Sequence, residues 1–287
     1  MNVKERFVDL IRNRDASLPT LPVVIGNLLA KADSESATPE ELARFLSNDQ
    51  SLAARVLRIA NSPYYGLLRK IDSIPRAVTV IGFREVVSIA LGSGVIGLLT
   101  PREKGGLIDP VELWRHSIAV GFASKEAGKI TGKPLEDSVM LAGLLHDVGK
   151  ILFLIYFMAD YAEVLVKHQA EGIPIHLAEA ELLGIDHAQI AFLLMKQWNF
   201  PDSICMPVRH HHDIDQCPAE HRAVALLVGA ADYACHVAGM GMSANTAPER
   251  NDVNLRAIGL TEQGLEKLID ASRSMTAEVE AFLEAVS

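Results

Sequence analysis

The sequence predicts an all-α fold, and three observations support that prediction. Apolar residues make up 49% of the 287 residues but aromatic residues only 6%, so the core must consist mainly of Leu, Ile, Val and Ala. These residues recur every three or four positions, which is the spacing of one face of an α-helix. No convincing alternation of apolar and polar residues marks a half-buried strand. Packed helices are therefore expected throughout.

The charge balance and the cysteines exclude several classes of protein. The net charge is −9 and no basic run or stripe appears, so a nucleic acid is not expected as a partner. Three cysteines, at 205, 217 and 235, lack C-x-x-C spacing. An odd number without that spacing favours buried free thiols in a reducing compartment over disulfides or a zinc ribbon.

Neither an export signal nor a membrane span is predicted. Residues 1–15 read as a charged amphipathic helix without the apolar core of a signal peptide. The longest apolar stretch, 139–158, is interrupted by His146, Asp147 and Lys150. Such charges favour a core helix over a membrane span. A cytoplasmic protein without a membrane partner is expected.

Pro- and Gly-rich breaks at 18–22, 100–110 and 239–252 organise the chain, and the predicted parts are 1–105, 106–240 and 241–287. In the first part, Thr38 is expected to cap a helix over 39–47, because Pro39 and two glutamates follow it. Apolar periodicity predicts further helices at 50–60, 74–81 and 83–98.

The second part holds nearly all the histidines, and helices are expected there at 110–130, 136–157, 159–171, 174–183, 187–198, 202–211 and 219–238. The tail, about 254–286, shows further amphipathic helices, one of them with Thr261 as its N-cap. These tail helices are expected to serve packing.

Glu112 and His116 are the first candidate metal ligands. They lie four residues apart on the helix predicted after Pro110, so both side chains leave one face. That spacing can place two ligands on one ion. An isolated pair of this kind is more often a surface glutamate and an ordinary helix histidine.

A stronger signal is the run of His146, Asp147 and Lys150 inside an otherwise apolar segment. These side chains carry a large desolvation cost in a core unless something pairs with them. A metal ion is one such partner, and an Asp–Lys pair with a histidine hydrogen bond is the other. Gly149 favours the metal. Glycine weakens a helix by about 1 kcal/mol, and this cost has no obvious gain unless another group must approach the backbone closely there.

The remaining candidates lie further along the chain. His187 opens a predicted helix, and three consecutive histidines, 210–212, end another. Neighbours on a helix diverge by about 100°, so at most two of the three can face one site. Asp232 is a carboxylate set among small apolar residues, and a neighbouring Lys or Tyr could also satisfy it.

Together, His116, His146 with Asp147, and Asp232 resemble the H…HD…D signature of the HD superfamily of metal-dependent phosphohydrolases. The segments 18–22, 49–57 and 61–66, which read LPTLP, DQSLAARVL and NSPYYG, resemble its HDOD subgroup. The resemblance covers about residues 18–240. It implies an N-terminal helical layer (1–105) on an HD-type metal-binding core (106–240), with a helical tail (241–287) packed on that core.

The resemblance also implies a ligand set. HDOD domains commonly have degenerate metal residues and act as interaction modules in bacterial signalling, whereas this chain keeps the four signature residues. It also has further candidates at positions similar to the extra ligands of HD-GYP phosphodiesterases, namely Glu112, His187, His211 and His212. The Gly-Tyr-Pro element of those enzymes is missing after Asp213, so their cyclic-dinucleotide substrate is not implied.

Three hypotheses follow. The first is a metal-dependent phosphohydrolase that uses one or two divalent transition ions (Fe, Mn, Ni, Co or Zn) on a small phosphoester. In it, Asp147 bridges the ions and Lys150 contacts either the phosphate or Asp147. The second is a signalling module with a structural or vestigial metal, whose partner is a signalling protein. The third is a di-iron oxygenase.

Overall fold

The structure is a computed structural model that describes residues 2–13, 18–32, 38–100, 108–133, 136–246 and 248–286. Within these ranges it contains helices and no strand, which confirms the all-α prediction. The predicted break around Pro101, Gly105 and Gly106 and the predicted helix end at Asp15 lie outside the described residues. The boundary between residues 105 and 106 therefore stays a prediction.

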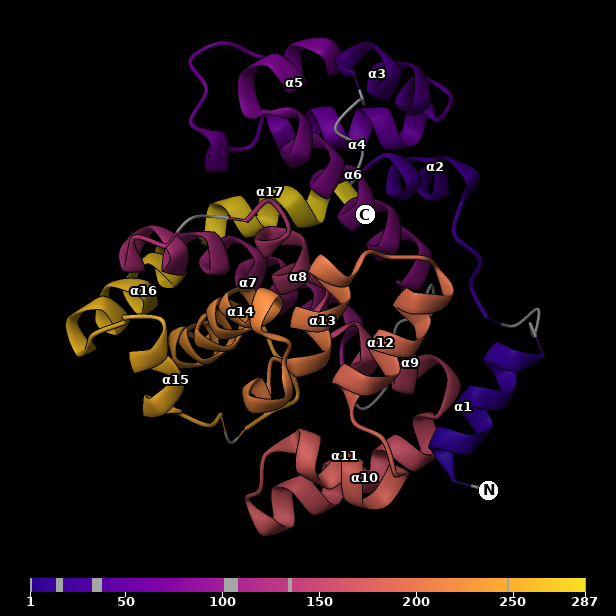
Figure 1. The fold of residues 1–287 in the computed structure, drawn as a ribbon, viewed down its shortest axis with the longest axis vertical. Helices are drawn as coiled ribbons and strands as arrows, with labels where there is room; N and C mark the ends of the chain where they lie inside the picture. The colour runs from indigo at the N-terminus through magenta and orange to yellow at the C-terminus, as the bar shows by residue number, and fades with distance from the viewer. Residues whose placement is uncertain are drawn as a thin grey trace.

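The first half of the chain forms a layer of short helices (Figure 1). Its elements are α2 (Val23–Ala32), α3 (Pro39–Ser47), α4 (Gln50–Ala60), the 3₁₀ helix η1 (Pro63–Tyr65), α5 (Ile74–Ile81) and α6 (Phe83–Leu99). Helix α6 leaves this layer and packs against α8, so it joins the layer to the rest of the molecule.

The second half is a helical core around α7 and α14. Its elements are α7 (Pro110–Thr131), α8 (Val139–Leu145), α9 (Val148–Tyr156), α10 (Met158–Glu171), α11 (Ile175–Leu183), α12 (His187–Gln197), α13 (Asp202–His210), η2 (Ile214–Gln216) and α14 (Ala219–Ala238). Helix α7 packs on both α8 and α14, and α12 packs on α9 and α13. These contacts bring the histidine-bearing helices together.

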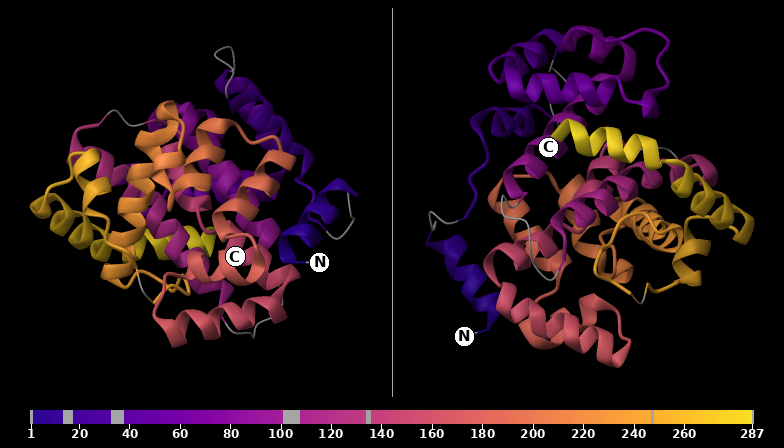
Figure 2. Two further views of the ribbon diagram at one scale, coloured as in Figure 1. Left: turned by 60° about the horizontal axis from the view of Figure 1, so that its bottom comes forward. Right: turned by 180° about the vertical axis from the view of Figure 1, so that it is seen from behind.

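The two ends of the chain pack at different places. The tail helices are α15 (Asp252–Ala257), α16 (Glu262–Ser274) and α17 (Thr276–Val286). Helix α17 lies between the N-terminal layer and the core, in contact with both α4 and α7 (Figures 1 and 2). Helix α1 (Val3–Arg12) instead packs against α12, and Arg6 pairs with Asp160 of α10 at 3.0 Å.

The predicted helix starts are confirmed by their caps. The Thr38 side chain accepts a hydrogen bond from the Glu41 amide, and the Glu41 side chain accepts from the Thr38 amide, which makes a capping box. Thr261 caps α16 through the Gly264 amide. Asp186 caps α12 through the Gln189 amide, so the first residue of that helix is His187.

One predicted helix is wrong at its middle. Instead of a single helix over 136–157, α8 ends at Leu145 and α9 begins at Val148. The Asp147 backbone has φ −99° and ψ 7°, outside the helical region. A continuous helix would turn adjacent side chains about 100° apart. The break lets His146 and Asp147 both face the same side.

Glycines set the spacing around this break. A Cβ at Gly149 would collide with the carbonyl group of His187, so α9 and α12 touch backbone to backbone there. On α8, a Cβ at Gly143 would lie 2.9 Å from the Val120 carbonyl oxygen of α7. The close approach expected at Gly149 is confirmed, and it places His187 next to Asp147.

The cysteines and the longest apolar stretch of the sequence lie in the buried core. Cys205, Cys217 and Cys235 are free and buried, as predicted. Val139–Tyr156 is long and apolar enough to cross a membrane, but 89% of it is buried inside the fold. Helices α5 and α6 are long and apolar enough to cross a membrane only if they are taken together, and they are bent by 119° at their junction.

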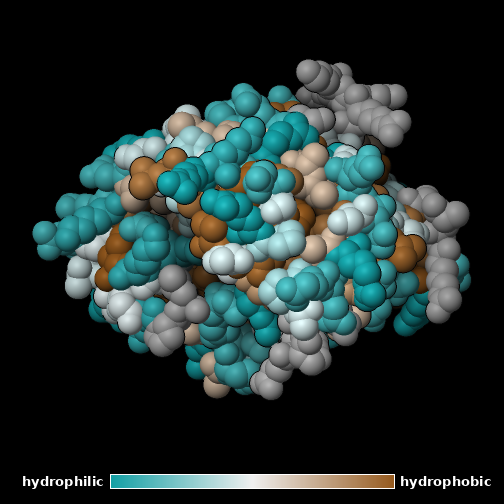
Figure 3. Space-filling view, turned by 90° about the horizontal axis from the view of Figure 1, so that it is seen from above, coloured by the Kyte–Doolittle hydropathy of each residue, from teal (hydrophilic) through white to brown (hydrophobic). Residues whose placement is uncertain are grey.

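The face of the molecule seen in Figure 3 is largely hydrophilic, with apolar residues in small separate groups.

We expect Gly149→Ala to lower the free energy of unfolding by about 3 kcal/mol, the upper end of usual overpacking costs, because the new methyl group meets backbone that cannot rotate away. Urea denaturation followed by circular dichroism measures the change. The matched control is Gly26→Ala on α2, where a Cβ would have no atom of the described residues within 4 Å apart from those of its chain neighbours and its own helix backbone. That variant should be unchanged or more stable by about 1 kcal/mol. Equal stability of both variants would contradict the packing argument.

Candidate metal centre

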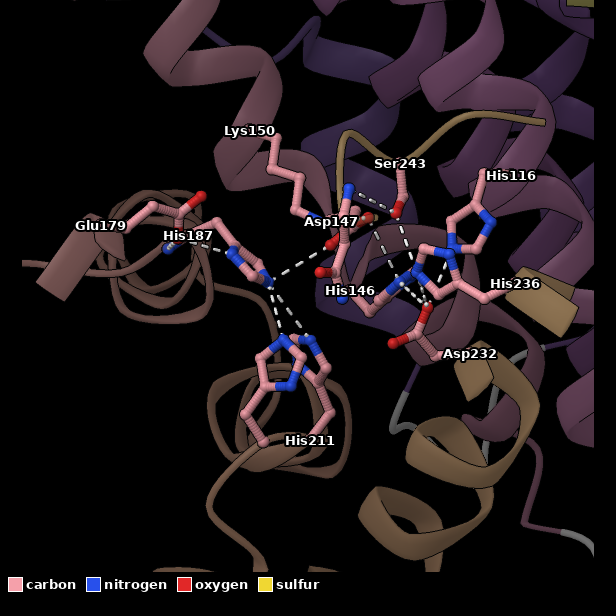
Figure 4. A network of polar contacts seen from close by, with 12 residues as sticks. His116, His146, Asp147, Lys150, Glu179, His187, His211, Asp232, His236 and Ser243 are labelled. Atoms are coloured by element: carbon pink, nitrogen blue, oxygen red, sulfur yellow. Dashed lines mark hydrogen bonds and ion pairs between the residues drawn. The ribbon is translucent and has the colours of Figure 1, made fainter. Parts of the chain in front are cut away.

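Five segments of the core bring the predicted ligands to one place (Figure 4). His116 comes from α7, His146 and Asp147 from the break between α8 and α9, His187 from the start of α12, His211 and His212 from the end of α13, and Asp232 from α14. The side chains of His116, His146 and His187 are fully buried. Asp147 is 2% exposed and Asp232 13%.

The cluster has two groups of ligand atoms. In the first group, His116, His146 and Asp232, the Asp232 Oδ1 atom lies 2.9 Å from His116 Nε2 and 3.6 Å from His146 Nε2. In the second group, His187, His211 and His212, His187 Nε2 lies 3.4 Å from His211 Nε2 and 3.0 Å from His212 Nε2.

Asp147 lies between the two groups. Its Oδ2 atom is 3.5 Å from His146 Nε2 in the first group. Its Oδ1 atom is 3.3 Å from His187 Nε2 in the second group. One carboxylate therefore faces both groups with different oxygens, which is the position expected of a bridging ligand.

Four of the imidazoles are held in one tautomer. Their Nδ1 atoms each face an oxygen, namely Met240 O at 3.1 Å for His116, Gly143 O at 2.7 Å for His146, Val208 O at 2.7 Å for His211 and Glu179 Oε2 at 2.6 Å for His187. Because these oxygens only accept, Nδ1 must carry the hydrogen and donate it. In a neutral ring, Nε2 then presents a lone pair to the cluster, as metal-binding histidines do.

These lone pairs face other acceptors. His187 Nε2 and His211 Nε2 point at each other, and two acceptors cannot form a hydrogen bond. Among the described residues, neither His146 Nε2 nor Asp147 Oδ1 has a hydrogen-bond partner, although both are buried. Buried unsatisfied acceptors are costly unless a cation meets them. The donor set of imidazole nitrogens and carboxylate oxygens fits a divalent transition metal ion.

The charge states also suit ligation. Burial raises the pKa of Asp147, but His146, Lys150 and His187 lower it more, so the net direction is down. Burial lowers the pKa of His211 and His212 well below the usual value, and neighbouring imidazoles lower it further. The carboxylate is therefore ionised and these two rings are neutral near pH 7, which are the forms that bind metals.

Lys150 is fully engaged with Asp147. It is 3% exposed, and its Nζ atom lies 2.8 Å from Asp147 Oδ2. Of the two contacts predicted for it, the structure contains the one to Asp147. This ion pair offsets one negative charge but leaves Asp147 Oδ1 facing the second group.

Two sequence candidates lie apart from the cluster. The Glu112 side chain pairs with Arg115, which Glu280 of α17 also holds, so its spacing from His116 does not bring its carboxylate into either group. His210 ends α13 outside both groups, whereas His211 and His212 belong to the second. At most two of the three histidines were expected to face one site, and two do.

Glu179 is a site residue that the sequence analysis did not identify. This carboxylate is fully buried in α11, where it accepts hydrogen bonds from the amide and the Nδ1 atom of His187 and from the Tyr161 hydroxyl. It lies eight residues before His187 but on a different helix, so helix periodicity does not link the two residues. Its role follows only from the packing of α11 beside α12.

His236 was also missed, although a signal existed. It lies four residues after Asp232 on α14, and its Nε2 atom is 3.3 Å from Asp232 Oδ1. The i, i+4 argument applied to Glu112 and His116 would have found it equally well.

A cavity of about 70 Å³ opens beside the second group. His211, His212 and Asp232 line it at the cluster. The rest of its wall is neutral or acidic, and includes His176, Tyr233, Asn254 and Glu249. The His176 ring stacks on His212 with centroids 4.1 Å apart. The cavity gives a small molecule a route to the second group.

Comparisons with known proteins agree with this fold. The profile of the HDOD domain family matches residues 18–214. An uncharacterized protein of Treponema pallidum (strain Nichols) is 25% identical over 229 residues, which is 77% of this chain. The chain spans only 43% of the length of that curated relative.

Solved structures are similar over almost the whole chain. An HDOD domain protein of unknown function from Geobacter sulfurreducens is 28% identical, with a TM-score of 0.74 over 99% of this chain and 98% of that one. A Shewanella amazonensis protein provisionally named a phosphohydrolase is 24% identical, with a TM-score of 0.73 over 98% of each chain. A Marinobacter aquaeolei protein provisionally named a signal transduction protein is 21% identical, with a TM-score of 0.77 over 99% of this chain and 65% of that one. The last two show the fold alone.

We expect Glu179→Gln to weaken binding of divalent ions about 10- to 100-fold, since an amide holds the His187 Nδ1 hydrogen less strongly than a carboxylate does. Calorimetric titration of metal-free protein with Zn²⁺ measures the affinity. Glu181→Gln on the same helix is the matched control, because that side chain is 61% exposed and pairs only with Lys167 in the described structure. Equal affinities of the two variants would show that Glu179 does not orient His187.

Proposed function

This chain belongs to the HDOD domain family, and we propose that its buried histidine–aspartate cluster binds divalent transition metal ions and hydrolyses a small phosphoester, as part of bacterial signal transduction. The observation that carries the proposal is the set of Nε2 lone pairs that face acceptors on both sides of Asp147. Two ions would satisfy both groups. The first would be held by His116, His146 and Asp232, the second by His187, His211 and His212, with Asp147 shared.

Divalent ions held in this way supply Lewis-acid chemistry, in that they favour ionisation of water near neutral pH and stabilise negative charge on a phosphoryl oxygen. The donor set favours Fe, Mn, Ni, Co or Zn over Ca or Mg. Nothing in the donor set separates these metals from one another.

The side chains themselves have positioning roles. Lys150 fixes Asp147 by a 2.8 Å contact, so that the two carboxylate oxygens keep facing opposite groups. Glu179 keeps the hydrogen of His187 on Nδ1 and the lone pair on Nε2. The cavity lies beside His211 and His212, where a small phosphoester could reach the second group.

The names of structural neighbours guide the choice of assay. Two neighbours from Shewanella amazonensis are provisionally named phosphohydrolases, one of them metal-dependent, and that from Marinobacter aquaeolei is provisionally named a signal transduction protein. These names support testing phosphoesters first and regulatory output second.

A second candidate is a signalling module whose metal ions are structural and whose partner is a protein. One observation favours it: no Lys or Arg is among the described residues that line the cavity, and Glu249 is. An anionic phosphoester would find no cation there apart from the metal ions. The same turnover assay separates the two candidates.

We expect protein loaded with Mn²⁺ or Fe²⁺ to hydrolyse bis(p-nitrophenyl) phosphate or p-nitrophenyl phosphate. The variant His211→Ala should lower kcat/KM at least about 100-fold, which corresponds to a loss of about 2.7 kcal/mol of transition-state stabilisation. His210→Ala is the matched control, since this neighbouring histidine lies outside both groups. Release of p-nitrophenol is followed by absorbance.

Metal content of each preparation is measured by elemental analysis. Loaded protein that turns over no phosphoester, nucleotides included, would rule out the hydrolase in favour of the signalling module. In cells, intact regulatory output from His146→Ala and Asp147→Ala variants that bind no metal would have the same consequence.

A further inference from the structure

Three imidazoles, not two, converge on Asp232. Its Oδ1 atom lies 2.9 Å from His116 Nε2, 3.3 Å from His236 Nε2 and 3.6 Å from His146 Nε2 (Figure 4). In their neutral forms, His116 and His146 present lone pairs on Nε2, because their Nδ1 atoms donate to carbonyl groups. A carboxylate oxygen surrounded in this way is poorly satisfied by hydrogen bonds alone. The same atoms form a nearly complete coordination shell once a cation lies among them.

His236 is built into this arrangement. Its side chain is only 10% exposed, and its ring packs against that of His116 with centroids 4.6 Å apart and planes at 43°. The ligand atoms of His116, Asp232 and His236 all lie within 4.8 Å of one another. That spread is compatible with bonds of about 2.0–2.2 Å from each atom to one ion.

The segment after α14 lies against the ring of His236. Ser243 is buried, and its Oγ atom lies 2.8 Å from His236 Nε2, the same atom that faces Asp232, so this contact would give way when the ring binds an ion. The backbone that leads to Ser243 is attached to the first turns of α7: the Met240 carbonyl accepts from His116 Nδ1, and the Met242 amide donates to the Glu112 carbonyl at 3.3 Å. At Gly241, where φ is +70°, a Cβ would lie 2.6 Å from the His116 amide nitrogen. His236 and His116 are therefore held in one rigid unit.

We propose that His236 is a further ligand of the ion bound by His116, His146 and Asp232. This inference rests on the metal site of the proposed function and specifies its first ion. Three imidazole nitrogens then accompany the carboxylates of Asp232 and Asp147. A nitrogen-rich shell of this kind favours Zn²⁺, Co²⁺, Ni²⁺ or Fe²⁺ over Mn²⁺ or Mg²⁺.

The extra ligand makes the two ions unequal. Of the described residues proposed to hold the first ion, Asp232 alone lines the cavity, whereas both His211 and His212 of the second group do. The first ion would therefore have more protein ligands and less contact with the cavity, and would be the more tightly held. The second ion, with fewer protein ligands and two of them at the cavity, would be the one that exchanges more easily.

Titration of the full-length, metal-free protein with Co²⁺ tests the proposal. We expect two ions per chain with distinct affinities, and His236→Ala should weaken the tighter site by at least about 100-fold while the weaker site stays within about 3-fold. This loss exceeds the 10- to 100-fold typical of residues that only orient a ligand. Visible absorption of bound Co²⁺ provides a second readout, because removal of an imidazole changes the ligand field.

His221→Ala, another histidine on α14 that belongs to neither group, is the matched control and should leave both sites unchanged. His236→Cys, which keeps a metal ligand, should restore part of the tight affinity. Retention of the weaker site and of the circular dichroism spectrum shows that His236→Ala folds.

The outcomes separate this inference from the proposed function. A tight site in His236→Ala within about 3-fold of the unsubstituted protein would overturn the inference and leave the proposed function standing. Loss of the tight site, in a protein that turns over no phosphoester, would support the inference and overturn the proposed function. Absence of any bound Co²⁺ in the unsubstituted protein would overturn both.

Discussion

Asp147 brings a negative charge into the centre of the core, and the surrounding helices are arranged to meet it. Lys150 neutralises one side of the carboxylate. The other contacts are to histidines whose Nε2 atoms carry lone pairs, since backbone carbonyls or Glu179 already take the hydrogens on Nδ1. Acceptors crowded around a buried carboxylate destabilise a fold unless a cation lies among them. The buried acceptors that would destabilise the apolar core are thus the same atoms that would bind a metal ion.

Close backbone packing makes this arrangement possible. Gly149 lets α9 touch the start of α12, and Gly143 lets α8 touch α7. Glycine in a helix is unfavourable by about 1 kcal/mol relative to alanine, so each close approach has a local cost. In return, His187 and Asp147 come within 3.3 Å even though forty residues of sequence separate them. The break between α8 and α9 adds the last requirement, because it turns two adjacent side chains toward one centre.

The N-terminal layer is joined to the helix that carries His116. In the NSPYYG segment, the Tyr65 hydroxyl donates to Glu85 of α6, and Lys125 of α7 donates to the same oxygen, both at 2.7 Å. The Tyr64 ring stacks on Phe122 of α7 with centroids 4.1 Å apart. Helix α17 fills the space between the layer and α7. The NSPYYG segment therefore joins the N-terminal layer to α7, the helix that carries His116.

The sequence by itself determined the helices and pointed to most of the residues of the cluster. Apolar periodicity placed nearly every helix, and caps such as Thr38 marked their starts, because both depend on neighbours within four residues. It missed α2, whose sequence VVIGNLLAKA offers little polar face to contrast with the apolar one. The His146–Asp147 pair stood out because charge inside an apolar run is costly in any fold. Only the tertiary structure could decide between Glu112 and His236, each four residues from another candidate. Glu112 pairs with Arg115, which Glu280 of α17 also contacts, and so stays outside the cluster. His236 lies beside His116, in contact with Ser243 of the segment after α14. Spacing fixes which residues share a helix face, but contacts between residues far apart in sequence decide what that face meets.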